Sequence, residues 1–182
     1  MAFSTVAFAV DIEVIRTVYG SNNQTLYWTI EEKFSYELQH NDLWFEEEIQ
    51  RGAITLRDAL MHIIEGRPQD NPVTAFQYGY AVELLCKHFG HFLDGDGLIN
   101  RIVDLEIQTA ILESGVPIPV PPPPDIPIIG HLTSEQVIDE YIHLKEQSLI
   151  HPDQYIEDAR QEFRSFLRQA HEKGLGLVSF TY

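Results

Sequence analysis

Five residues with metal-binding side chains fall within eleven positions of this sequence. They are Cys86, His88, His91, Asp94 and Asp96. Thiolate, imidazole and carboxylate groups are the ligands that zinc and similar divalent ions take from proteins. On one helix, however, residues two apart point about 200° away from each other, so a shared ion would require the chain to unwind near Gly90. The alternative interpretation is a buried thiol with two surface histidines.

A second candidate site combines a large aromatic residue with consecutive acids. Trp44 is followed closely by Glu46, Glu47 and Glu48. An indole ring attracts cations through its face, and carboxylates add a complementary charge. This pattern predicts a patch that could bind a basic partner. The simpler alternative is a solvated helix face.

A third candidate is a short row of arginines near the C-terminal end of the sequence. Arg160, Arg164 and Arg168 recur at steps of four, which places them on one side of a helix. Such a ridge could bind an anion or a phosphate group. The alternative is pairing within the molecule, for example with Glu157.

Carboxylates do not suggest a catalytic pair. Glu83 precedes Lys87 by one helical turn, in the order that favours an ion pair, so ordinary pairing outweighs acid–base catalysis. Serine, histidine and cysteine positions form no recognisable nucleophilic arrangement either. We therefore assign no catalytic residue and expect no cofactor.

The chain is strongly acidic, with 28 acids, 12 bases and a net charge of -16. Residues 1–113 carry 18 acids and 7 bases, and residues 114–182 carry 10 and 5. This charge repels nucleic acid and attracts a basic protein. Solubility alone is the alternative explanation.

The elements that must position these residues are mostly helical, with a strand at each end. Residues 3–10 and 175–182 have strand-forming patterns, and we expect them to pair because neither has another evident partner. Thr55 with Asp58, and Thr133 with Gln136, resemble capping boxes. Hydrophobic periodicity and capping signals predict helices over about 11–18, 24–40, 44–51, 55–65, 73–89, 97–113 and 152–173, and one that opens at Thr133 and turns Val137, Tyr141 and Leu144 inward. In the third helix Trp44, Phe45 and Ile49 should point inward, and in the fifth Gln77, Glu83 and Lys87 should form a narrow polar stripe.

Seven of the ten prolines lie in residues 117–127, where they exclude helix and regular sheet. We expect this proline-rich segment to form an extended strap packed along the helical body. Its apolar residues Ile118, Val120, Ile126 and Ile128 should contribute buried area, with an aromatic residue of the body (Trp28, Trp44, Tyr78 or Tyr80) in contact. The predicted fold class is mainly α (α+β), a compact helical domain with a small sheet formed by the terminal strands. One domain over residues 1–182 is favoured, and a split into two lobes around 115–130 is the alternative.

The compartment is predicted from composition and from the start of the sequence. Cys86 is the only cysteine, so the chain cannot form an internal disulfide. The apolar first ten residues lack a basic region and are followed at once by Asp11, which argues against a signal peptide. No apolar run is long enough to span a membrane. We expect a soluble cytoplasmic protein; its oligomeric state cannot be predicted.

Three runs of residues combine aromatic and small packing side chains, namely Phe76 to Cys86 (FQYGYAVELLC), Asp42 to Phe45 (DLWF) and Pro124 to Gly130 (PDIPIIG). Together they resemble an uncharacterised bacterial family that is catalogued only as a domain of unknown function. The resemblance extends over roughly residues 1–145. It implies a bacterial single-domain protein and brings no site residue with it.

These observations together favour a non-enzymatic acidic interaction protein. Its most specific form is an immunity-type protein or a regulatory partner that neutralises a basic protein by surface complementarity. The alternative is a small-molecule or metal-binding domain, or an enzyme, that uses a cleft near residues 83–96.

Overall fold

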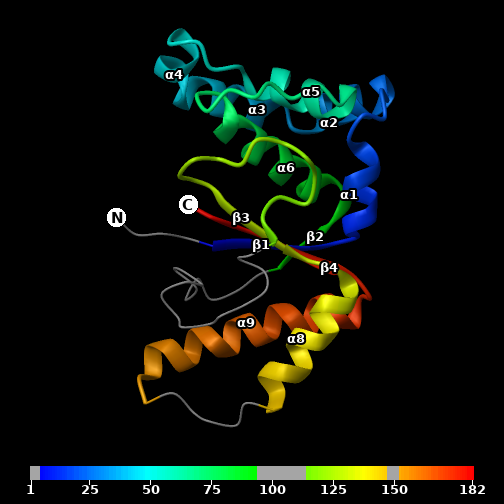
Figure 1. The fold of residues 1–182 in the computed structure, drawn as a ribbon, viewed down its shortest axis with the longest axis vertical. Helices are drawn as coiled ribbons and strands as arrows, with labels where there is room; N and C mark the ends of the chain where they lie inside the picture. Colours follow the sequence, from blue (N-terminus) through cyan, green and yellow to red (C-terminus); the bar gives the residue numbers. More distant parts are fainter. Residues whose placement is uncertain (1–4, 94–113, 147–151) are drawn as a thin grey trace.

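The computed structural model describes residues 5–93, 114–146 and 152–182. Figure 1 shows a small sheet in the middle of the molecule, with helices α1 to α6 on one side and helices α8 and α9 on the other. The predicted α+β class is confirmed. The two helical layers are referred to below as the upper layer (α1–α6) and the lower layer (α8, α9).

The two terminal strands lie side by side, as predicted. Strand β1 (Thr5–Val10) pairs antiparallel with β4 (Gly176–Thr181), with Val6 opposite Phe180. Two further strands, β2 (His91–Leu93) and β3 (Ile128–Leu132), extend the described sheet to the order β2-β1-β4-β3. These two strands were not predicted. Strand β2 has only three residues and directly follows the helical pattern of α6, and β3 has five residues and directly follows the proline-rich segment.

Successive residues of β1 point to opposite faces of the sheet. Phe8 and Val10 enter the core of the upper layer, whereas Ala7 and Ala9 enter the core of the lower layer. Val178 and Phe180 of β4 join the first core, and Leu177 joins the second. Both faces of the sheet are therefore buried, and β1 is apolar along nearly its whole length.

Helices α1 (Ile12–Val18) and α5 (Leu56–Glu65) begin at the predicted caps. The Asp11 side chain accepts a 2.9 Å hydrogen bond from the Glu13 amide. Thr55 and Asp58 form the complete capping box. These local hydrogen bonds satisfy amides that a helix start leaves unpaired, so the sequence alone could fix both starts.

The single helix expected over residues 24–40 is instead two helices, α2 (Gln24–Lys33) and α3 (Ser35–Trp44). The chain bends at Phe34, where φ is -114° and ψ is 26°. Apolar residues at steps of four drift around a straight helix by about 40° per step. The bend corrects this drift and buries both Ile30 and Leu38 completely.

The prediction that Trp44 points inward is wrong, because its side chain is 74% exposed. Helix α3 ends at Trp44, and the chain turns at Phe45 before the short helix α4 (Glu46–Gln50). Phe45 takes the inner position, with its ring centroid 4.7 Å from that of Phe76. The turn leaves Trp44 on the outer surface.

Helix α6 (Ala75–Phe89) has no solvated stripe along Gln77 and Glu83, contrary to expectation. Gln77 is 0% exposed and Glu83 is 7% exposed. A Cβ atom added at Gly79 would come within 2.8 Å of Pro127 Cγ and 3.1 Å of Pro123 Cγ. The proline-rich segment therefore lies against this side of α6, which the sequence pattern of the helix could not reveal.

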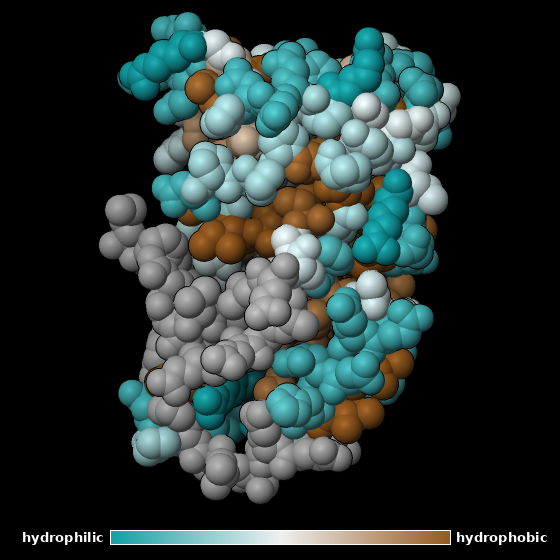
Figure 2. Space-filling model, viewed as in Figure 1, coloured by the Kyte–Doolittle hydropathy of each residue, from teal (hydrophilic) through white to brown (hydrophobic). Residues whose placement is uncertain are grey.

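The apolar residues of the proline-rich segment divide into two groups. Ile118 and Val120 are buried and belong to the upper core. Ile126 and Ile128 are 39% and 44% exposed, so the expectation that they are buried is wrong. Figure 2 shows a hydrophobic band across the middle of the viewed face, between hydrophilic surfaces over the upper and lower layers.

The lower layer consists of α8 (Ser134–Glu146) and α9 (Gln154–Glu172) in the described residues. The Thr133 amide donates to the Gln136 side chain over 2.9 Å, and the Gln136 amide donates to Thr133 Oγ1 over 3.3 Å, which confirms the second capping box. The helix predicted over 97–113 lies outside the described residues. Within the described ranges every helix is too short or too polar to cross a membrane.

Candidate functional site

A pocket of about 400 Å³ opens between helix α3, helix α6 and the end of strand β4. Its volume lies within the range of small-ligand sites. The pocket combines aromatic rings with a few polar groups and is lined by Tyr36, Glu37, His40, Asn41, Trp44, Phe45, Tyr80, Glu83, Lys87 and Tyr182.

The outer wall of the pocket is one face of α3. Tyr36, His40 and Trp44 recur at steps of four and form a row of stacked rings. The Tyr36 and His40 centroids are 5.8 Å apart with an interplanar angle of 29°, and those of His40 and Trp44 are 6.3 Å apart at 23°. Tyr36 and Trp44 are each 74% exposed. This exposed row has no covering element in the described part of the chain.

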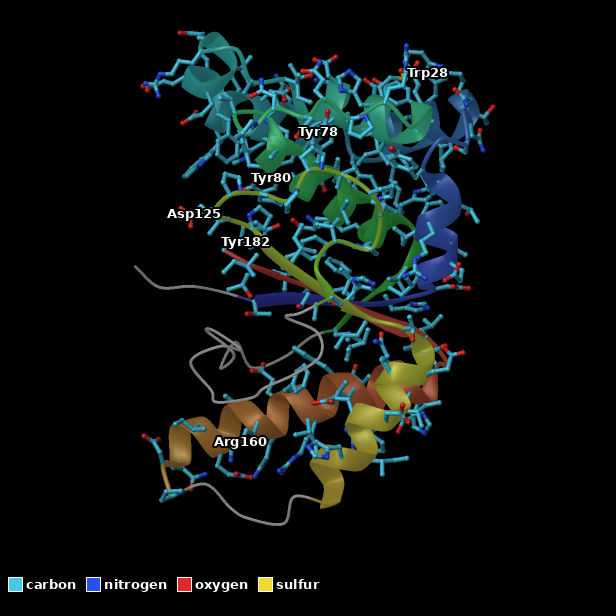
Figure 3. All side chains as sticks on the ribbon, viewed as in Figure 1. Trp28, Tyr78, Tyr80, Asp125, Arg160 and Tyr182 are labelled. Carbon is cyan, nitrogen blue, oxygen red and sulfur yellow. The ribbon has the colours of Figure 1, made fainter. Side chains whose placement is uncertain are left out.

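The inner wall is formed by rings that lie far apart in the sequence. Tyr80 of α6 stacks on Tyr182, with centroids 5.6 Å apart and an interplanar angle of 25°. Phe45 lies 5.4 Å from Tyr80. Figure 3 shows Tyr80 and Tyr182 close together, one from α6 and the other beyond the end of the sheet. The wall therefore depends on the position of β4 beneath α6.

A charged network lies at the base of this inner wall. Glu83 accepts a hydrogen bond from the Tyr182 hydroxyl through Oε2, and its Oε1 lies 2.9 Å from Lys87 Nζ. The predicted pairing of Glu83 with Lys87 is confirmed. Since Glu83 is 7% exposed, both partners are needed to stabilise its buried charge.

The two phenols of the inner wall, Tyr80 and Tyr182, have raised pKa values. Burial, and then the nearby charge of Glu83, raise the pKa of Tyr80 to about 12. The same two causes, in the same order, raise the pKa of Tyr182. Both phenols therefore remain hydrogen-bond donors at neutral pH. With Glu83 already engaged by two donors, the arrangement suits binding better than proton transfer.

The predicted acidic patch adjoins this pocket. Trp44 forms part of the outer wall, and Glu46, Glu47 and Glu48 make up the first turn of α4. Glu47 pairs with Arg51 over 2.8 Å, and Glu46 accepts a 3.0 Å hydrogen bond from Gln50. The patch is therefore an acidic rim beside an aromatic pocket and not a free-standing site.

The potential metal ligands are dispersed where the structure describes them. Cys86 is 0% exposed within the upper core, and burial raises its pKa. His88 is partly buried beside Phe34, and His91 is exposed on β2. Asp94 and Asp96 lie outside the described residues. Among the described residues no three His, Cys, Asp or Glu side chains gather in a way that could hold a metal ion.

The arginine ridge lies on α9, in the lower layer. Arg164 Nη1 lies 3.4 Å from Glu157 Oε1, which is the internal pairing named as the alternative to an anion site. Arg160 is partly buried and Arg168 is exposed. Figure 3 places Arg160 on the opposite side of the sheet from Tyr80 and Tyr182, so the ridge is separate from the pocket.

Sequence analysis missed most of the pocket. The Tyr36, His40 and Trp44 spacing was a usable signal, because residues four apart share one helix face. Tyr80 and Tyr182 gave no such signal, since their contact joins positions 102 residues apart. Asn41 falls between the two helices predicted over 24–40 and 44–51, and only the structure shows that it belongs to α3 and is buried beside the pocket.

Comparison with known proteins gives a family and no activity. Searches of curated proteins and of solved structures find no match to this chain. A family described as "Domain of unknown function (DUF7691)" matches residues 1–182. The match extends beyond the 145 residues over which we saw a resemblance, and includes α9 and β4. The chain therefore belongs to the DUF7691 family.

Proposed function

We propose that this protein is a non-enzymatic acidic interaction protein, of regulatory or immunity type, that binds a basic partner protein through the pocket between α3 and α6. A cationic side chain of the partner enters the pocket. The single observation that carries the proposal is the set of stacked rings in the two walls, Tyr36–His40–Trp44 and Tyr80–Tyr182.

Ring faces support a cationic ligand because they carry negative electrostatic potential. A cation within about 6 Å of a ring centroid gains roughly 0.5–2 kcal/mol, depending on how well it is desolvated. The exposed rings of α3 are of the types that concentrate in binding hot spots, because tyrosine and tryptophan are enriched there. Their position on an exposed helix face therefore favours contact with a partner. An apolar ligand could pack against the rings, but it would gain nothing from the negative charge around the pocket.

Charge gives the second line of support. The chain has a net charge of -16, and Glu37 lines the pocket while Glu46, Glu47 and Glu48 lie beside it. Such a field steers basic molecules toward the pocket and raises association rates. Lys87 pairs with the buried carboxylate of Glu83, and Arg51 pairs with Glu47 of the rim, so the charge offered to a partner comes mainly from Glu37, Glu46 and Glu48.

The two tryptophans allow a direct test of this proposal. Trp28 lies on α2, away from the Tyr80–Tyr182 stack in Figure 3, whereas Trp44 lines the pocket. In a Trp28→Phe variant, fluorescence reports on Trp44 alone. We expect a saturable change on titration with a peptide of alternating glycine and basic residues. The change should weaken strongly between about 0.05 and 0.5 M salt, because salt shortens the screening length.

Charge variants separate the rim from the overall charge. Replacing Glu46, Glu47 and Glu48 together by Gln should slow peptide association. The matched control, Glu135→Gln with Asp139→Asn and Glu172→Gln, removes the same charge from exposed positions of the lower layer and should have a smaller effect. Equal effects of both triple variants, no change in Trp44 fluorescence, or an equal change with a glutamate peptide would each contradict the proposal.

A further inference from the structure

Asn41 is the one residue of the pocket that is buried and has an unused hydrogen-bonding atom among the described residues. Its side chain is 9% exposed, and its Oδ1 has no hydrogen-bond partner in the described part of the chain. A buried acceptor without a partner costs about 1–3 kcal/mol, and native proteins hold few of them. Such a group in the lining of a pocket indicates a ligand that donates a hydrogen bond.

The two carboxylates that line the pocket, Glu83 and Glu37, differ in burial and in their hydrogen-bond partners. Both oxygens of Glu83 are engaged, one by Tyr182 and one by Lys87. The Glu37 carboxylate is exposed at the pocket edge. Of the amide and carboxylate oxygens that line the pocket, a ligand would therefore find two without a partner among the described residues, the amide oxygen of Asn41 inside and the carboxylate of Glu37 at the entrance. The Oδ1 atom itself is fully buried, so a ligand meets it only after the amide turns, and the terminal torsion of an asparagine is soft enough for this turn.

From this geometry we infer, resting on the function proposed above, that the pocket selects arginine over lysine and that Asn41 is the residue that determines this choice. A guanidinium group is planar and carries five N–H donors, so it can stack on a ring and donate to acceptors in its own plane at the same time. An ammonium group has no plane to stack. Tyr36 and Trp44 stand at the two ends of the stacked row, at 29° and 23° to His40, and the face of each ring that is turned away from His40 lies outside the stack and provides a stacking face.

Three peptides with the same glycine spacing test the inference in the Trp28→Phe protein. Their variable residue is arginine, lysine or citrulline, which keeps the planar shape of arginine but has no charge. We expect the arginine peptide to bind about tenfold more tightly than the lysine peptide, which corresponds to about 1.4 kcal/mol. The citrulline peptide should bind more weakly than the arginine peptide.

Variants at Asn41 assign the selectivity to this residue. Asn41→Leu has the same branched skeleton, although its methyl groups are larger, and it has no acceptor, so it should bring the arginine-to-lysine affinity ratio close to one. Urea denaturation of this variant checks that the fold is kept. Asn41→Asp keeps an acceptor and should retain the preference. As a control, Gln39→Leu at an exposed position of the same helix should leave the ratio unchanged.

The outcomes separate the inference from the proposed function. If neither basic peptide binds, both fail. If the arginine and lysine peptides bind equally well, the proposed function stands and the selectivity is overturned. An unchanged ratio in Asn41→Leu would overturn the role of Asn41, and a citrulline peptide that binds as tightly as the arginine peptide would show that charge is not recognised.

Discussion

Tyr182 connects the C-terminal strand to helix α6 through its side chain. The hydroxyl donates to Glu83, and the ring stacks on Tyr80 with centroids 5.6 Å apart. Glu83 is buried, so each of its partners offsets part of the cost of desolvating the carboxylate. One residue therefore contributes both to the wall of the pocket and to the stability of the charged network beneath it.

Replacing Tyr182 by Phe tests this contribution. The ring and its stacking remain, but Glu83 loses one donor, so we expect the free energy of unfolding to fall by about 1–3 kcal/mol. Urea denaturation followed by circular dichroism measures it. Tyr36→Phe, at a 74% exposed position, is the control and should change stability by less than about 0.5 kcal/mol. A Tyr182→Phe effect as small as the control would mean that the hydrogen bond contributes no net stability.

Helix α6 and the proline-rich segment fit together because residue 79 has no side chain. An added Cβ would meet Pro127 Cγ at 2.8 Å and Pro123 Cγ at 3.1 Å, and proline rings cannot move aside as a flexible side chain can. Glycine lowers helix stability by roughly 1 kcal/mol relative to alanine. Its presence in the middle of α6 is explained by this close approach.

Gly79→Ala should therefore destabilise the protein, although alanine is the better helix former. The cost of overpacking, about 1–3 kcal/mol, outweighs the gain of roughly 1 kcal/mol in helix propensity, and we expect a net loss of up to about 2 kcal/mol. The melting temperature measures the change. Gln39→Ala on the exposed face of α3 should be neutral or slightly stabilising. A more stable Gly79→Ala protein would indicate that the proline-rich segment separates easily from α6.

At the scale of the whole molecule, strand β4 connects the two helical layers. It pairs with β1 on one side and β3 on the other. Its residues enter both cores, Val178 and Phe180 above and Leu177 below. Both layers lose core residues if β4 is displaced. We therefore expect the upper and lower layers to unfold together.

Thermal unfolding should accordingly show one transition by both tryptophan fluorescence, which reports on Trp28 and Trp44 of the upper layer, and far-ultraviolet circular dichroism of the whole chain. Deleting residues 176–182 should abolish this transition, because it exposes both cores and leaves β1 and β3 without a shared partner. Limited proteolysis with proteinase K, followed by mass spectrometry, is the second measurement. Two transitions, or rapid cleavage within residues 115–130, would support the alternative of two lobes.

Much of the fold could be predicted because its signals are local. Asp11, Thr55 and Thr133 begin helices by bonding with residues two or three positions away. The pairing of the terminal strands followed from their alternation and from the lack of other candidates. The errors arose where distant groups decide the outcome: the bend at Phe34 follows the shape of the core, and Trp44 is exposed because Phe45 occupies the inner position.

The class of the fold, the helix starts, the acidic charge and the place of Trp44 beside three glutamates can all be read from the order of the residues. The pocket and its lining exist only in the folded chain. Tyr80, Glu83 and Tyr182 meet because the sheet places β4 below α6, and the polar Asn41 is buried within the folded upper layer. Helix caps and strand alternation depend on neighbours in the chain, whereas a binding site depends on contacts between residues that only the folded chain brings together.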